Sequence, residues 1–98
     1  MEEVKIADLK PGMKEIIIKG QIVSKDEPRE VTTKYGKKIM LSNAIVEDDS
    51  GSVQLSLWGE DSTKYKIGDN ITIENCYVGQ FKGNIQISVG RNGKITLG

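Results

Sequence analysis

The chain has 98 residues, of which 37% are hydrophobic and 29% charged, with 14 basic and 14 acidic side chains and no histidine. This length suits one domain with a modest core, and no stretch approaches the ~20 apolar residues of a membrane span. The opening "MEEVK" lacks the basic start and apolar run of a secretory signal, and a single cysteine excludes an internal disulfide. We therefore expect a soluble protein of the cytoplasm.

The neutral net charge argues mildly against a nucleic-acid partner, but the charges are unevenly spread. Residues 47–61 carry five acidic side chains and no basic one. Residues 25–38 carry five basic and three acidic side chains, and residues 75–98 carry three basic and no acidic ones. A neutral chain can still present one basic face, although solvated loops would give the same pattern.

The first half of the chain predicts two strands. In residues 14–24, Ile16, Ile18 and Ile22 share one face of an alternating pattern, with Gly20 in phase among them. An in-phase glycine indicates a sharp bend, as at the corner of a small barrel. Residues 39–47 form a second strand that is apolar on both faces, so its register stays open.

The second half of the chain predicts three more strands. A tight turn at residues 48–51 leads into a third strand, 52–58, which completes a β-hairpin. A polar piece, 60–66, indicates about one helical turn. Strands four and five follow at 70–78 and 84–89, and after the "GRNG" turn at 90–93 the sequence "ITL" continues strand five. Closure removes exposed sheet edges, so we expect an all-β, five-stranded barrel with a short helical turn between strands three and four.

The third strand puts the only tryptophan on its polar side. Val53, Leu55 and Leu57 share the apolar face, whereas Trp58 alternates in phase with Gln54, Ser56 and Ser52. The indole could fold back to cap the barrel. Alternatively, it could stack on a nucleic-acid base whose edges bond to the polar neighbours.

Several segments together resemble the single-stranded DNA-binding OB-fold domains of archaeal SSB and archaeal replication protein A. They are "IADLKPGM" (6–13), "AIVEDDSGSVQLSLWG" (44–59) and "GDNITIENCYVGQFKGNIQISVGRNGKI" (68–95). The most specific parts are the acidic turn leading to "LWG" and the Y-x-x-x-F-K-G segment. The resemblance covers almost the whole chain and implies an OB-fold barrel in which Trp58, Tyr77 and Phe81 stack on successive bases.

The stacking role of Tyr77 conflicts with simple alternation. Tyr77 is in phase with Ile71 and Ile73, so a regular strand would bury it. A β-bulge near Asn75 and Cys76 would shift the phase and turn Tyr77 outward. A buried Tyr77 remains the alternative, and Phe81, expected in the following turn, could instead form a lid over one end of the barrel.

Loops flanking the aromatic residues supply the expected contacts with the nucleic-acid backbone. OB-folds bind ligands with the loop between strands one and two, here residues 27–38, and with the four-to-five loop. The lysines suit phosphates. A stacking role for Tyr35 is inferred from its place in this loop and not from the resemblance, because the family often has a small polar residue there. The expected backbone or base-edge contacts are Lys34, Tyr35, Lys37, Lys38, Gln54, Ser56, Lys82 and Arg91.

The sequence gives little support for catalysis. It has no histidine, no "GxxxxGK" phosphate loop and one cysteine, so we expect no enzyme, no metal and no cofactor. The favoured function is sequence-tolerant binding of single-stranded DNA in replication, recombination and repair, in the nucleoid. The alternatives are an OB domain for protein contacts in a replication complex, and an RNA-binding OB domain. We expect residues 1–98 to be one OB domain, which could belong to a longer protein.

Overall fold

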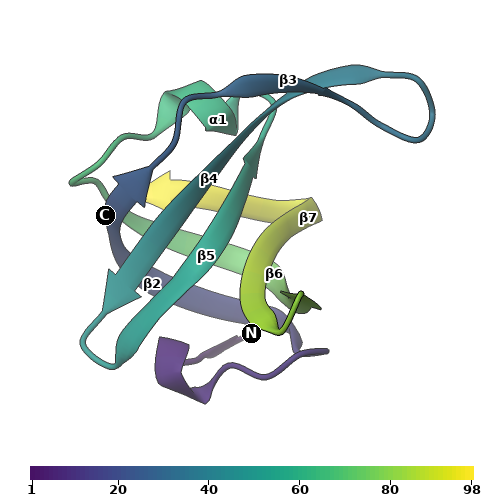
Figure 1. The fold of residues 1–98 in the computed structure, drawn as a ribbon. Helices are drawn as coiled ribbons and strands as arrows, with labels where there is room; N and C mark the ends of the chain where they lie inside the picture. The colour runs from purple at the N-terminus through teal and green to yellow at the C-terminus, as the bar shows by residue number, and fades with distance from the viewer.

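A computed structural model describes residues 1–89 and 92–98. Most of these residues lie in strands, with two short helical turns between them (Figure 1). The elements in chain order are β1 (Glu2–Glu3), the 3-10 turn η1 (Ile6–Asp8), β2 (Lys14–Lys25), β3 (Arg29–Thr32), β4 (Lys38–Asp48), β5 (Gly51–Trp58), α1 (Asp61–Lys64), β6 (Asn70–Phe81) and β7 (Asn84–Leu97).

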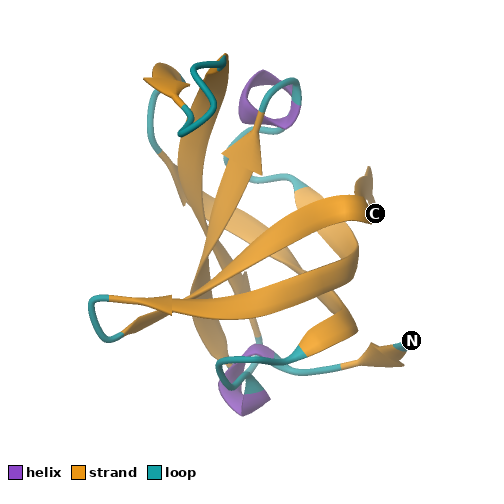
Figure 2. Cartoon of the chain, turned by 90° about the vertical axis from the view of Figure 1, so that its right-hand side faces the viewer, coloured by secondary structure: helices purple, strands orange, loops and turns teal.

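Five of the strands close into a barrel. The sheet runs in the order β2-β6-β7-β5-β4, and pairing of β2 with β4 closes the ring. Within this ring β5 and β7 run parallel, and the other neighbours are antiparallel. Two hairpins project from the barrel, β3–β4 and β6–β7, and Figure 2 shows both chain ends on the side away from the β6–β7 tip. The predicted five-stranded barrel is confirmed.

Alternating apolar side chains fill the barrel as the sequence predicts. The side chains of Ile16, Ile18 and Ile22 on β2 and of Val53, Leu55 and Leu57 on β5 all point into one core. The open register of β4 is settled by its partners, because Ser42, Ala44 and Val46 face inward, whereas Leu41 and Ile45 lie on the outer side. The Ser42 hydroxyl is fully buried and donates to the backbone oxygen of Asp26 at 2.8 Å, so its burial leaves no unpaired polar group.

Gly20 lies where β2 changes its pairing partner. The following residue, Gln21, pairs with Asn70 of β6 and with Glu47 of β4. A Cβ atom at position 20 would lie 2.6 Å from the Val46 side chain and 2.7 Å from the Glu47 oxygen. Only glycine fits this corner, which confirms the bend that the in-phase glycine predicts.

Three local predictions need correction. Residues 29–32 form strand β3 paired with β4, so the expected loop 27–38 is largely a hairpin. Strand β6 extends to Phe81, which is therefore the last residue of a strand and not part of a turn. The turn expected at residues 90–93 falls within the bounds of β7, and Gly90 and Arg91 lie outside the described residues.

Candidate nucleic-acid interface

Three large aromatic rings of the barrel strands β5 and β6 remain exposed. Trp58 at the end of β5 is 41% exposed, Tyr77 in β6 is 48% exposed, and Phe81 at the end of β6 is 61% exposed. By contrast, Tyr65 is 3% exposed, and its hydroxyl donates to the Ile95 carbonyl at 2.7 Å. The chain therefore buries one of its five aromatic rings, Tyr65, and keeps four on the surface, these three and Tyr35.

A β-bulge turns Tyr77 outward, as predicted. Between β6 and β7 the register shifts between Glu74 and Cys76, and Asn75 has a φ of 57°. After the bulge Cys76 and Val78 face the core, so the residue between them faces solvent. The alternative of a buried Tyr77 is wrong.

The glycine at position 93 is a signal for this bulge that sequence reasoning missed. A Cβ atom there would lie 2.8 Å from the Glu74 oxygen and 2.9 Å from the Asn75 oxygen. The bulged backbone of β6 thus presses on β7 at a position where only glycine leaves enough space. Asn75 adds a side-chain hydrogen bond to the Asn92 carbonyl at 3.3 Å.

The ends of the strands hold the other two rings. Trp58 pairs with Leu41 of β4 and is followed by Gly59, whose φ of 62° starts the turn away from the sheet. Phe81 is followed by a two-residue turn in which Lys82 and Gly83 have φ values of 51° and 82°, as in a type I′ hairpin. The Lys82 ammonium lies 5.4 Å from the centre of the Phe81 ring, so charge and ring are presented together.

Strand pairing brings the outward side chains of four strands onto one surface, which we call the aromatic face. On β5, Ser56 pairs with Ser88 of β7, and Ser88 pairs with Tyr77 of β6. Tyr77 is therefore about 10 Å from Ser56 across the sheet, and Phe81 is about 13 Å from Tyr77 along its strand. Trp58, two positions after Ser56 on β5, therefore lies on the same surface as Tyr77, although the two residues are 19 positions apart in the sequence.

Sequence reasoning identified only part of that polar set. Gln54 and Ser56 lie half-buried on the face, as expected. The polar residues paired with them on β4 and β7 were missed. Alternation within those strands does not show which side chains share a surface with β5 until the strand pairing is known. These further polar residues of the face are Asn43, Gln86 and Ser88.

The predicted phosphate-binding lysines lie on the β3–β4 hairpin, which we call the arm (residues 29–41). At its tip the Thr33 N–H donates to the Lys37 carbonyl at 2.7 Å, and the tip extends beyond the barrel (Figure 1). Tyr35 is 82% exposed, and the Lys34 ammonium lies 5.2 Å from its ring centre. Lys38 lies 4.0 Å from Glu30; within the described part of the chain, Lys34 and Lys37 form no ion pair.

Asp26 fixes the arm to the barrel. Its Oδ1 accepts hydrogen bonds from the Asn43 N–H at 2.8 Å and from the Ser42 hydroxyl at 3.1 Å, and Oδ2 lies 3.3 Å from the Arg29 guanidinium. Burial raises the pKa of the Asp26 carboxyl, but these hydrogen bonds and the Arg29 charge outweigh it and lower the pKa below 3.8. The carboxylate is therefore charged at neutral pH.

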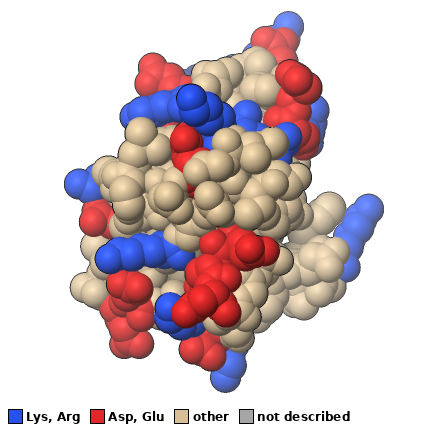
Figure 3. All heavy atoms as spheres, turned by 90° about the vertical axis from the view of Figure 1, so that its left-hand side faces the viewer, with Lys and Arg blue, Asp and Glu red and all other residues tan. Residues whose placement is uncertain are grey.

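Charge on the face of the molecule turned away from the arm is mixed. Figure 3 shows acidic and basic side chains next to one another above and below a band of uncharged residues. Such a face has no single-sign field to attract a polyanion. Of the predicted contacts outside the arm, Lys82 is exposed beside Phe81, and Arg91 lies outside the described residues.

The described residues offer few groups suited to catalysis or metal binding. Burial raises the pKa of the Cys76 thiol from 9.0 to about 11, so the thiol is protonated at neutral pH. Residues 1–89 and 92–98 contain no cluster of three or more His, Cys, Asp or Glu side chains that could hold a metal ion. Across those same residues, no helix has the length and apolar character that crossing a membrane requires.

The barrel is an OB fold. It resembles the OB domain of a Thermoplasma acidophilum protein with a TM-score of 0.86 and 24% identity, covering 100% of this chain and 88% of that one. Residues 9–97 match the family described as single-stranded DNA binding protein Ssb-like, OB fold, and the chain belongs to that family.

Two relatives support the assignment. The chain is 38% identical over 95 residues to the single-stranded DNA binding protein Ssb of Saccharolobus solfataricus, covering 97% of this chain and 63% of that protein. It is 35% identical over 97 residues to replication factor A of Methanothermobacter thermautotrophicus, covering 93% of this chain and 12% of that protein. The chain therefore corresponds to one part of each relative.

Proposed function

We propose that this chain binds single-stranded DNA with little dependence on sequence, by stacking bases on Trp58, Tyr77 and Phe81. The observation that carries this function is the gathering of three exposed rings on one sheet surface, one of them turned outward by a bulge. Each base stacked on an aromatic side chain contributes about 1 to 3 kcal/mol, and any base can stack. A relative that aligns with 97% of the chain is named a single-stranded DNA binding protein.

Phosphate contacts complete the proposed binding mode. Lys34, Lys37 and Lys38 on the arm and Lys82 beside Phe81 would neutralise phosphates at the two ends of the face. Gln54 and Ser56 would bond to base edges between the rings. With few phosphates neutralised, the salt dependence should be shallow, about 0.7 in log–log slope for each contact.

The proposed binding unit is small. A single OB domain covers at least about 4 nucleotides, and we expect roughly 4 to 6 here. Residues 1–98 would act as one such unit, alone or beside other domains, covering exposed single strands in replication, recombination and repair. Other replication or repair proteins could bind at the same time. The function needs no metal, cofactor or catalytic group.

Tryptophan fluorescence tests the function directly, because Trp58 is the only tryptophan. Short oligo-dT, duplex DNA and oligo-U are titrated in parallel, with N-acetyltryptophanamide as the control for light absorption by the nucleic acid. We expect saturable quenching that is strongest with oligo-dT and weak with the duplex. Equal or tighter duplex binding would overturn the function.

The same titrations separate the alternative functions. A domain that serves only protein contacts would leave the Trp58 signal unchanged by every oligonucleotide. An RNA reader would discriminate through the 2′-hydroxyl and prefer oligo-U. The stacking mode predicts tolerance of both sequence and missing hydroxyls.

A further inference from the structure

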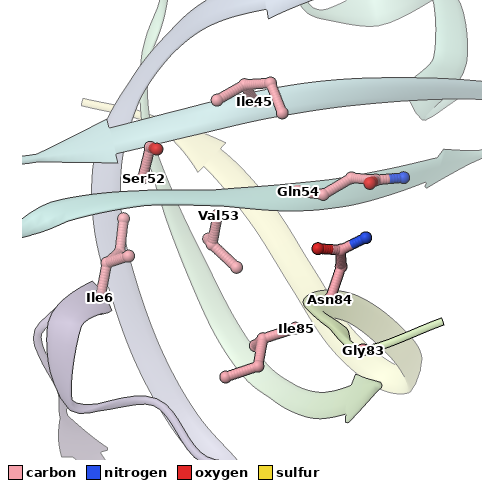
Figure 4. Close-up of a pocket in the computed structure, with 8 residues that line it drawn as sticks. All are labelled: Ile6, Ile45, Ser52, Val53, Gln54, Gly83, Asn84 and Ile85. Carbon is pink, nitrogen blue, oxygen red and sulfur yellow. The ribbon is translucent and has the colours of Figure 1, made fainter. Parts of the chain in front are cut away.

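A groove of about 440 Å³ lies beside the aromatic face, at the point where β5 and β7 separate. The parallel ladder between them comprises the pairs Gln54–Gln86, Leu55–Ile87 and Ser56–Ser88. The residues before it, 52–53 on β5 and 84–85 on β7, diverge and form the two walls (Figure 4). We call this space the β5–β7 groove.

The lining of the β5–β7 groove combines an apolar floor with amide groups at the rim. Ile6 and Val53 are buried, and Ile85 is half-buried beside them. Figure 4 shows the Asn84 side chain pointing toward β5 and the Gln54 side chain lying along β5, so that both amides line one end of the groove. An apolar cleft with a few polar groups that fix orientation is typical of a site for a small planar ligand.

The charge of the lining limits the choice of ligand. None of the eight lining residues is acidic or basic. A phosphate or a carboxylate would find no countercharge there, whereas an uncharged ring with polar edges would contact both the floor and the amides. Amide side chains pair a donor with an acceptor, the pattern that Asn and Gln use to bond two atoms of one base edge.

The groove is continuous with the aromatic face. Asn84 pairs with Phe81 across the two-residue turn, and Gln54 is two positions from Ser56 on the outer side of β5. A strand whose base stacks on Phe81 therefore has the groove within reach of its next base. The aromatic face accepts any base, but the groove offers hydrogen-bonding groups at one defined position.

We propose that the β5–β7 groove takes one unstacked base from the end of the bound single strand, with Asn84 and Gln54 bonding to its edge. The inference rests on the proposed function and adds a base-selective position to a binding mode that is otherwise tolerant of sequence. The base would enter between the backbone segments 52–53 and 84–85. Its ring would lie on the side chains of Ile6, Val53 and Ile85.

Methyl NMR can detect a base in the groove. The protein, labelled at isoleucine and valine methyl groups, is titrated with a dT hexamer and with hexamers that carry dA, dC or dG at one position. We expect shifts of the Ile6 and Ile85 methyl signals and intermolecular NOEs from base protons to them. A strand confined to the outer aromatic face would not reach Ile6, which lies in η1. If the Ile6 and Ile85 signals stay unchanged with every oligonucleotide, no base enters the groove and the inference is overturned. The same result is expected if the groove binds a peptide strand instead of a base.

Affinities for the same hexamers test selectivity. At one position, at one end of the strand, the best base should bind at least about fivefold more tightly than the worst, the low end for a two-bond amide contact. Asn84→Leu should reduce that ratio to about twofold or less, because the Gln54 amide then bonds to the base edge without its partner. Gln80→Leu, an amide on the same hairpin outside the groove, should keep the ratio. Thermal melting checks that both variants fold.

The outcomes separate this inference from the proposed function. If oligo-dT quenches Trp58 but no position shows selectivity, the groove is not a base site and the stacking function stands. If selectivity is present and Asn84→Leu retains it, the assignment of the amide is wrong. If oligo-dT does not bind at all, both proposals fail.

Discussion

The aromatic face and the arm are held by the fold in different ways. On the face, Tyr77 stands between two core residues, Cys76 and Val78, so packing on the other side of the strand fixes where the ring points. On the arm, Lys34 and Tyr35 extend past a turn closed by backbone hydrogen bonds and touch no core. In the proposed binding mode, a rigid surface would fix the position of each base, whereas a phosphate would need only a nearby positive charge. Substitutions on the face and on the arm should therefore have different signatures.

The largest expected effect separates a core ring from a face ring. Tyr65→Ala removes a buried side chain with a hydrogen-bonded hydroxyl and should lower the free energy of unfolding by about 3 to 5 kcal/mol. Tyr77→Ala should lower it by about 1 kcal/mol or less, because about half of the ring is exposed. The same Tyr77 variant should lose about 1 to 3 kcal/mol of binding to oligo-dT.

Denaturant unfolding and oligo-dT titration of both variants provide the measurement. Trp58→Ala and Phe81→Ala should behave like Tyr77→Ala, with binding followed by fluorescence anisotropy of a labelled oligonucleotide where the tryptophan is removed. A variant of Tyr77 that melts early yet binds normally would mean that the ring supports the fold and not the ligand.

A pair of glycines compares the barrel with the arm. Gly20→Ala would place a Cβ atom 2.7 Å from the Glu47 backbone oxygen, and we expect a loss of about 2 to 3 kcal/mol of stability. At the arm tip, the Cβ atom added by Gly36→Ala would have no other atom within 4 Å. Only the backbone strain at a φ of 81° would lower the stability of this variant, by about 1 kcal/mol. Thermal melts of the two variants measure this difference. Equal losses would mean that the corner at Gly20 relaxes easily.

Removing charge from the arm should change salt dependence more than sequence preference. The triple variant Lys34→Ala, Lys37→Ala, Lys38→Ala should weaken binding to all single strands alike and reduce the log–log salt slope by about 2. A control with the same net charge replaces Lys10, Lys19 and Lys94 by alanine, away from the arm. Titrations at several salt concentrations measure the slope. An unchanged slope in the arm variant would remove the arm from the binding mode.

The smallest effect concerns the junction of arm and barrel. Because the folded state lowers the pKa of Asp26, its charge contributes stability above the unfolded pKa near 3.8, and this contribution is lost as pH falls through the lower folded pKa. Asp26→Asn should cost about 1 kcal/mol at neutral pH by weakening the hydrogen bonds from Ser42 and Asn43. It should also flatten the decline of melting temperature below about pH 4. Identical acid profiles for the two proteins would show that Asp26 does not control this decline.

Much of the barrel could be predicted, because inward and outward residues alternate clearly in β2 and β5. The outward turn of Tyr77 could also be predicted, since stacking by this residue and strict alternation cannot both hold without a bulge. The register of β4 could not, because both of its faces are apolar and only the cross-strand partners decide between Ser42 and Leu41. The arm was taken for a loop because β3 is four residues long with one apolar side chain, Val31.

Those parts of the candidate site that depend on one β-strand alone could be predicted from the sequence. Trp58 stands out by parity within one strand, so its exposure could be inferred from the sequence. Ser88 and Gln86 lie on the same surface only because β7 runs parallel beside β5, and that contact joins segments about 30 residues apart. The stacking and phosphate-binding roles of the individual residues remain predictions that the variants above address.

The buried thiol of Cys76 provides a built-in chemical probe of barrel opening. A pH of 8 is about three units below the Cys76 pKa of about 11, so very little thiolate exists in the folded state. An alkylating reagent would therefore modify Cys76 mainly in molecules whose β6 has transiently left the barrel. The modification rate reports the population of that open form, and comparing the rate with and without oligo-dT would show how strongly a bound strand keeps the barrel shut.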